Sequence, residues 1–111
     1  MRDTLLCASL KVAKCIQTGD FDMLNSMNCL KKVSQEYIVD VLNDYGGMLN
    51  PIIDDEYEKN FQYIQIKNQD VYMTYLDMII DGERSDLTLI CEIELDKDEI
   101  VQIIVEDIHI M

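Results

Sequence analysis

The spacing of apolar residues changes near residue 60, and this change constrains the fold more than any other feature of the chain. The segment "SDLTLICEIEL" alternates apolar and polar side chains over most of its length. A period of two is typical of a strand with one buried face, and the segments on either side are equally rich in β-forming residues. The stretches "DGER" and "DKDE" between them are typical of hairpin turns. The sequence therefore predicts a four-stranded antiparallel sheet over residues 60–111.

Residues 1–47 show helical spacing instead. Apolar residues recur every three to four positions in "TLLCASLKVAKCIQTG", "DFDMLNSMNCL" and "VSQEYIVDVLNDYGG". Met23, Met27 and Leu30 are expected to face inward from the second helix, and Ser34 is expected to cap the third. Helices followed by antiparallel strands predict an α+β fold. We expect a single domain, 1–111, with three N-terminal helices packed on one face of a curved, cone-like sheet.

The last predicted strand, "IVQIIVEDIHIM", is apolar on both faces over much of its length. Strands that are buried on both faces have this pattern. The sequence therefore predicts a central position for this strand, or a helix on one of its faces and something else on the other.

The charge of the chain limits the classes of partner. There are 22 acidic and 9 basic residues, a net charge of −13, and residues 51–111 hold 16 of the acids with four bases, a net charge of −12. Nucleic acid and anionic membrane surfaces are disfavoured because both need clustered Lys and Arg. No apolar run reaches the ~18 residues of a membrane span. A basic protein partner is favoured, with plain solvation of the acids as the alternative.

The stretch "DDEYE" concentrates this charge. Its acids are expected to join those of the two hairpin turns in one acidic rim that binds Lys and Arg of a partner, and its tyrosine is a candidate aromatic anchor. A calcium loop is disfavoured because the stretch has no glycine for the tight turn. Solvated surface remains the alternative. The predicted partner-binding residues are Asp54, Asp55, Glu56, Tyr57, Glu58, Asp81, Glu83, Asp96, Asp98 and Glu99.

The single histidine, His109, follows Asp107 by two residues, so the two share one face of a strand. With Arg84 across the hairpin they form a candidate polar network at the end of the sheet. A contact with a partner and a catalytic triad with Ser85 are the alternatives. The triad is disfavoured because no Gly-rich oxyanion turn accompanies Ser85. We assign no catalytic residue.

An enzyme remains the alternative to a binding protein. A cone-like sheet can hold a small apolar substrate between helices and strands, with one acid or base inside. The candidates for such an isomerase-like site are Asp77 or His109 with Tyr63, Tyr72 or Tyr75. The same tyrosines are equally expected as ordinary cross-strand pairs.

Cysteines occur at positions 7, 15, 29 and 91, without a Cys-x-x-Cys spacing. One histidine does not complete a familiar zinc set with them, so neither a metal nor another cofactor is predicted. The N-terminus does not resemble a signal peptide because polar and charged residues interrupt its apolar core. A cytoplasmic protein with reduced, mostly buried thiols is expected.

Two C-terminal segments, "GERSDLTL" and "VEDIHIM", resemble the closing signature of a bacterial family of unknown function. Its members look like small α+β proteins of the cystatin-like or nuclear-transport-factor-like cone type. The resemblance implies a fold and carries over no catalytic residues. The charged turn "DKDE" and the heavier acidity depart from that pattern.

In size, charge and architecture the chain is also similar to bacterial immunity proteins of the contact-dependent inhibition type. That similarity is an analogy of form, not of motif. It implies a partner: a basic toxin, expected to be a nuclease, whose active site an acidic surface would cover without turnover. The free protein is expected to be a monomer or a weak dimer.

Overall fold

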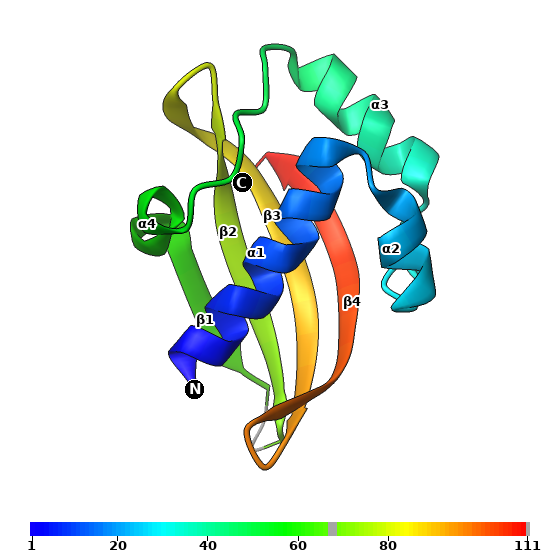
Figure 1. Ribbon diagram of the computed structural model, residues 1–111, viewed down its shortest axis with the longest axis vertical. Coiled ribbons are helices and arrows are strands. Elements are labelled where there is room, and N and C mark those ends of the chain that lie inside the picture. Colours follow the sequence, from blue (N-terminus) through cyan, green and yellow to red (C-terminus); the bar gives the residue numbers. More distant parts are fainter. Residues whose placement is uncertain (67–68, 111) are drawn as a thin grey trace.

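The computed structural model describes residues 1–66 and 69–110 and has the predicted α+β fold (Figure 1). Its helices are α1 (Arg2–Thr18), α2 (Phe21–Ser26), α3 (Gln35–Tyr45), α4 (Asp54–Tyr57) and the 3₁₀ turn η1 (Glu58–Asn60). Its strands are β1 (Phe61–Gln65), β2 (Val71–Ile80), β3 (Glu83–Asp96) and β4 (Glu99–Ile110). Residues 67, 68 and 111, which fall in the predicted sheet, lie outside the described residues.

The four strands form one antiparallel sheet in the order β1-β2-β3-β4. Two tight turns connect the long strands, and both central residues of each turn have positive φ, as in type I′ turns. Asp81 and Gly82 have φ of 53° and 80°, and Lys97 and Asp98 have 52° and 66°. The primed turns match the right-handed twist of the strands, so the predicted hairpins at "DGER" and "DKDE" are confirmed.

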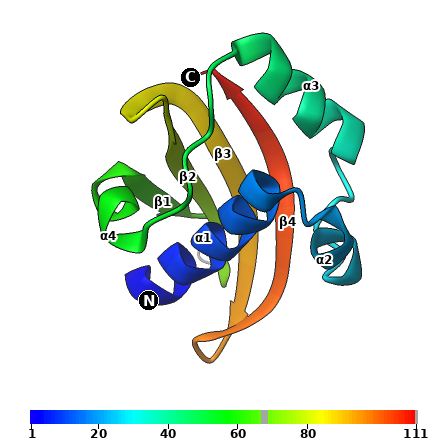
Figure 2. The same ribbon diagram turned by 45° about the horizontal axis from the view of Figure 1, so that its top comes forward.

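Helix α1 lies across one face of the sheet (Figures 1 and 2). Its side chains Leu5, Val12 and Ala13 are fully buried. At the centre of this contact the buried Ser9 hydroxyl donates to Thr74 Oγ1 at 3.0 Å, so two polar side chains are satisfied inside the apolar layer. The inside of the predicted cone is therefore a packed core over this part of the sheet.

Helices α2 and α3 lie along the β4 side of the sheet (Figure 1). Ser34 caps α3 as predicted, since its Oγ accepts from Tyr37 N at 3.1 Å. The inward orientation predicted for Met23 is wrong. Helix α2 begins at Phe21, so Phe21 and Leu24 share the buried side and Met23, between them, is exposed.

Strand β4 lies at an edge of the sheet, so the central position, one of the two alternatives predicted for it, is wrong, and helices α2 and α3 lie along its side (Figure 1). Its apolar residues have several environments: Val105 and Ile108 are buried toward the helices, whereas Val101 is exposed. The chain between α2 and α3 covers part of the edge, because Val105 N donates to Cys29 O at 2.9 Å. An edge strand can therefore be apolar on both faces without a neighbouring strand on each side.

Among the described residues, no helix combines the length and apolar character needed to cross a bilayer.

Candidate functional site

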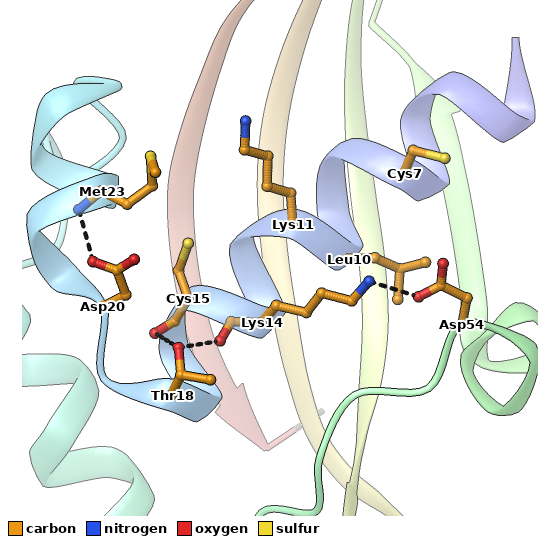
Figure 3. Close-up of a pocket in the computed structure, with 9 residues that line it drawn as sticks. All are labelled: Cys7, Leu10, Lys11, Lys14, Cys15, Thr18, Asp20, Met23 and Asp54. Carbon is orange, nitrogen blue, oxygen red and sulfur yellow. Dashed lines mark hydrogen bonds and ion pairs between the residues drawn. The ribbon is translucent and has the colours of Figure 1, made fainter.

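The acids of α4 and η1 are partly neutralised by α1. Lys14 Nζ lies 2.9 Å from Asp54 Oδ1, and Figure 3 shows the lysine reaching across the groove between the two helices. Arg2 lies 3.9 Å from the Glu58 carboxylate and donates to the backbone oxygen of the same residue at 2.7 Å. Of the four predicted acids in this cluster, two are therefore engaged by bases of the same chain.

Tyr57, the predicted aromatic anchor, faces the interior. The residue is 0% exposed, and its hydroxyl accepts from Ile79 N at 2.8 Å. Burial raises the pKa of this hydroxyl. The prediction that Tyr57 contacts a partner is wrong, because the α4 turn directs this side chain into the core while the acids of the turn stay exposed.

The two hairpin turns lie at opposite ends of the sheet, so their acids do not form one continuous rim (Figure 1). Strand β3 has 14 residues between the turns, a contour of roughly 45 Å at ~3.3 Å per residue. Asp81 at the β2–β3 turn also has a structural role, since it accepts from Met48 N at 2.8 Å. Asp81 and Glu83 are thus separated from Asp96, Asp98 and Glu99.

A compact group of carboxylates occupies the β3–β4 end of the sheet, which we call the acidic end. It consists of Asp70, Glu94, Asp96, Asp98 and Glu99, all exposed. The sheet register groups them: Val71 pairs with Glu94, Asp96 with Glu99, and Leu95 N donates to Asp70 O. Within the described part of the chain none of the five forms an ion pair, and Lys97 is the base among them.

The prediction had included three members of the acidic end and missed Asp70 and Glu94. Glu94 was visible in the alternation of "ICEIEL", which places it on the solvent face. Asp70 became a member through the pairing of β2 with β3, which no local pattern reveals.

Asp107 and His109 form the predicted polar pair, with a distance of 2.7 Å between His109 Nδ1 and Asp107 Oδ2. The missing partner is Tyr37 of α3, whose hydroxyl donates to Asp107 Oδ1 at 2.7 Å. Partial burial acts to raise the pKa of Asp107. The hydrogen bonds from Tyr37, from the backbone N–H of Ile108 and from His109 outweigh it, so the pKa lies below its usual value.

Arg84 does not belong to this network. Its Nε and Nη2 donate to Asp77 Oδ2 at 2.9 and 2.7 Å, within the β2–β3 hairpin. The ladder between β3 and β4 ends at the pair Leu87–Ile110, so no residue of β4 lies opposite Arg84. Ser85 donates to Met78 O at 2.6 Å, and the structure does not bring it together with His109.

Replacing Asp107 with Ala should reduce stability at neutral pH by about 1–2 kcal/mol, because three hydrogen bonds to a carboxylate are lost. A carboxylate with a lowered pKa stabilises the folded state above its unfolded pKa of ~3.9, and this contribution disappears as pH falls through the folded pKa. Urea unfolding of both proteins at pH 7 and near pH 3 measures it. Asp55→Ala, at an exposed carboxylate, is the control. A difference between wild type and Asp107→Ala that does not shrink in acid would contradict this role.

The residues of the alternative enzyme site divide between the two faces of the sheet. Tyr72 is buried on the side of α1, where its ring packs edge-on against Tyr63 at 6.2 Å between centroids. Tyr75 and Asp77 alternate with Thr74 and therefore lie on the opposite side, which we call the open face. Of these side chains, Asp77 and Tyr75 line one hollow on the open face, outside the predicted space between helices and strands, and Tyr63, Tyr72 and His109 do not line it.

Three of the four thiols are buried, as expected, and Cys7 is not. Cys7 lies on the narrow exposed stripe of α1, beside Lys11 and Lys14 (Figure 3). Burial raises the pKa of Cys29 to about 11 and that of Cys91 to about 12, so these two are poor nucleophiles at neutral pH. No group of three or more His, Cys, Asp or Glu side chains within residues 1–66 and 69–110 is placed to hold a metal ion.

A family model described as a domain of unknown function (DUF7668) matches residues 13–111, which include every strand and all helices after the first turns of α1. The comparisons with curated proteins and with solved structures found no match.

Proposed function

The chain belongs to the family of the domain of unknown function DUF7668, and we propose that it is an immunity protein. It binds a basic protein toxin, a nuclease, in the cytoplasm and covers the active site of that toxin without turnover. The observation that supports this proposal is the acidic end. Five exposed carboxylates are grouped there with Lys97 as the base among them, whereas two of the four acids in α4 and η1 are paired with bases of α1.

Such a surface suits a nuclease, because an enzyme that binds phosphates presents clustered Lys and Arg. Carboxylates at one end of the sheet would occupy that groove in place of the nucleic-acid backbone. Complementary charge speeds association and makes it sensitive to salt. Neutralising the acidic end should therefore reduce the association rate more than the same loss of charge elsewhere.

The test starts from capture of partners by the tagged full chain in its native cell. The captured protein is then expressed alone and together with the chain, and growth is measured. The proposal expects a basic nuclease that arrests growth alone and is harmless in co-expression. A captured protein that is acidic or non-toxic, or a toxin that still arrests growth in co-expression, would rule it out.

A charge comparison then locates the interface on the purified pair. One variant combines Glu94→Gln, Asp96→Asn, Asp98→Asn and Glu99→Gln. The matched control loses the same charge from exposed acids elsewhere, through Asp22→Asn, Glu36→Gln, Asp40→Asn and Asp44→Asn. We expect the first variant to associate about tenfold more slowly at low salt and to lose most of its salt dependence, and the control to change little. Equal effects of the two variants would show that net charge, not the acidic end, is responsible.

A further inference from the structure

The open face of the sheet has an apolar centre that no described helix covers. All helices lie on the other side of the sheet or along its margins (Figures 1 and 2). Ile64, Met73, Glu92 and Ile104 follow one another across the four strands in register, so this row consists of three apolar side chains and one carboxylate. Ile64 is 56% exposed, and the others are half-buried.

A second cross-strand row adds Tyr75 and Ile90 to the apolar residues of this face, between Gln62 on β1 and Asp107 on β4. Tyr75 lies between Gln62 on β1 and Ile90 on β3. Ile90 is buried without belonging to the core beneath α1, so its cover comes from its neighbours on the open face. Beside Tyr75, a hollow of about 330 Å³ is lined by Asn60, Gln62, Tyr75, Asp77, Arg84 and Thr88, and it is large enough to receive a side chain.

The acidic end adjoins this apolar centre directly. Glu94 of the acidic end borders the apolar centre, since it points to the open face two residues from Glu92. An apolar centre with a charged margin is the usual anatomy of a protein–protein interface. The strands, ~4.8 Å apart with ~3.3 Å per residue, present roughly 500–600 Å², which approaches the ~800 Å² that each partner contributes to a stable interface.

We propose that the basic partner docks on the open face, with apolar side chains on Tyr75 and Ile64 and with Lys and Arg on the acidic end. This inference rests on the proposed function, because it specifies the surface by which that partner is bound. The charge of the face selects a basic protein over a second copy of the chain, which would bring −13 of its own.

The test uses the full chain carrying the photo-cross-linking residue p-benzoylphenylalanine in place of Ile64. A matched chain carries it in place of Met48, which is 71% exposed and lies in the segment between α3 and α4. Each chain is irradiated in native-cell extract, and the cross-linked protein is identified and purified. The inference expects a basic protein cross-linked at position 64 and little or none at 48.

Affinity for the purified partner is then compared in variants of the two sites. Tyr75→Ala should weaken binding at least tenfold, as truncation of an interfacial aromatic does, while Tyr75→Phe and Met48→Ala should bind as wild type. Ile64→Ala should weaken binding to a smaller degree. Because Ile64 is exposed, this variant still tests the open face if Tyr75→Ala does not fold.

The outcomes separate this inference from the proposed function. A basic partner cross-linked at 48 and not at 64 overturns the docking face and leaves immunity standing. Cross-linking at 64 to a second copy, or to a protein that is not basic, overturns the docking face as well. A basic partner at 64 that fails the growth test keeps the docking face and removes immunity. No cross-link at either position overturns the docking face, and the growth test alone then decides immunity.

Discussion

Replacement of Tyr57 with alanine is expected to destabilise the protein by about 3–5 kcal/mol, the range for removal of a large aromatic side chain from a packed core. Tyr57 is fully buried between α4 and the end of β2, and its hydroxyl is the partner of the Ile79 backbone N–H. The substitution therefore removes apolar contact and leaves a buried donor unpaired. Denaturant unfolding followed by circular dichroism measures the loss.

Tyr57→Phe separates these two contributions. The ring stays and the acceptor is lost, so we expect a cost of about 1–3 kcal/mol, the penalty of an unsatisfied buried group. Tyr63→Phe is the matched control, because Tyr63 is half-buried beside the same strands and no hydrogen bond of its hydroxyl is found among the described residues. If both substitutions have the same small effect, the hydrogen bond from Ile79 N to Tyr57 contributes little to the free energy of unfolding.

Gly47→Ala should be the second severe change, at about 3 kcal/mol. The residue has φ of +77°, and a Cβ there would lie 2.6 Å from Ile80 Cγ2 and 2.7 Å from an Asp81 carboxylate oxygen. Backbone strain and the clash add together. The close approach exists because the chain after α3 pairs with the end of β2, with Leu49 opposite Ile80.

The neighbouring glycine provides an internal control for this prediction. Gly46 has nearly the same φ, +82°, but a Cβ there would have no atom within 4 Å. With ψ of 177°, Gly46 lies in a region that is essentially restricted to glycine, so Gly46→Ala should show backbone strain without the clash, about 2 kcal/mol and less than Gly47→Ala. Thermal unfolding of both variants measures the difference, and equal losses would mean that the contact with β2 yields freely.

Secondary structure was predictable where one periodicity dominated. The alternation of β3, the turn residues at Asp81–Gly82 and the Ser34 cap are local signals, and each one predicted its element. The edge position of β4 was not predictable in this way, because β4 has the apolar residues of a central strand. The sequence of β4 alone does not show that its outer edge binds the Cys29 carbonyl of a loop, or that one of its faces belongs to the open face.

The sequence mispredicted two residues of the candidate site, Tyr57 and Arg84, because it did not show where their side chains point. Tyr57 was placed among acids by its neighbours in the chain, but successive residues of a helix point about 100° apart, so Tyr57 faces the core while the acids beside it are exposed. Arg84 was expected to reach β4. The β3–β4 ladder ends at Leu87, three residues from Arg84, and the Arg84 side chain pairs with Asp77 of β2 instead. The alternation predicted Glu94 on the solvent face, whereas its grouping with Asp70 required the register of two strand pairs.

The bond from Val105 N to Cys29 O has a consequence for behaviour at high concentration. An unprotected edge strand is a template on which further chains can add, strand upon strand. On β4 that row of donors and acceptors is interrupted by the chain's own loop, and the opposite edge, β1, is five residues long. Addition of a further strand at this edge would therefore require detachment of the loop between α2 and α3, so that segment protects β4 against edge-to-edge association.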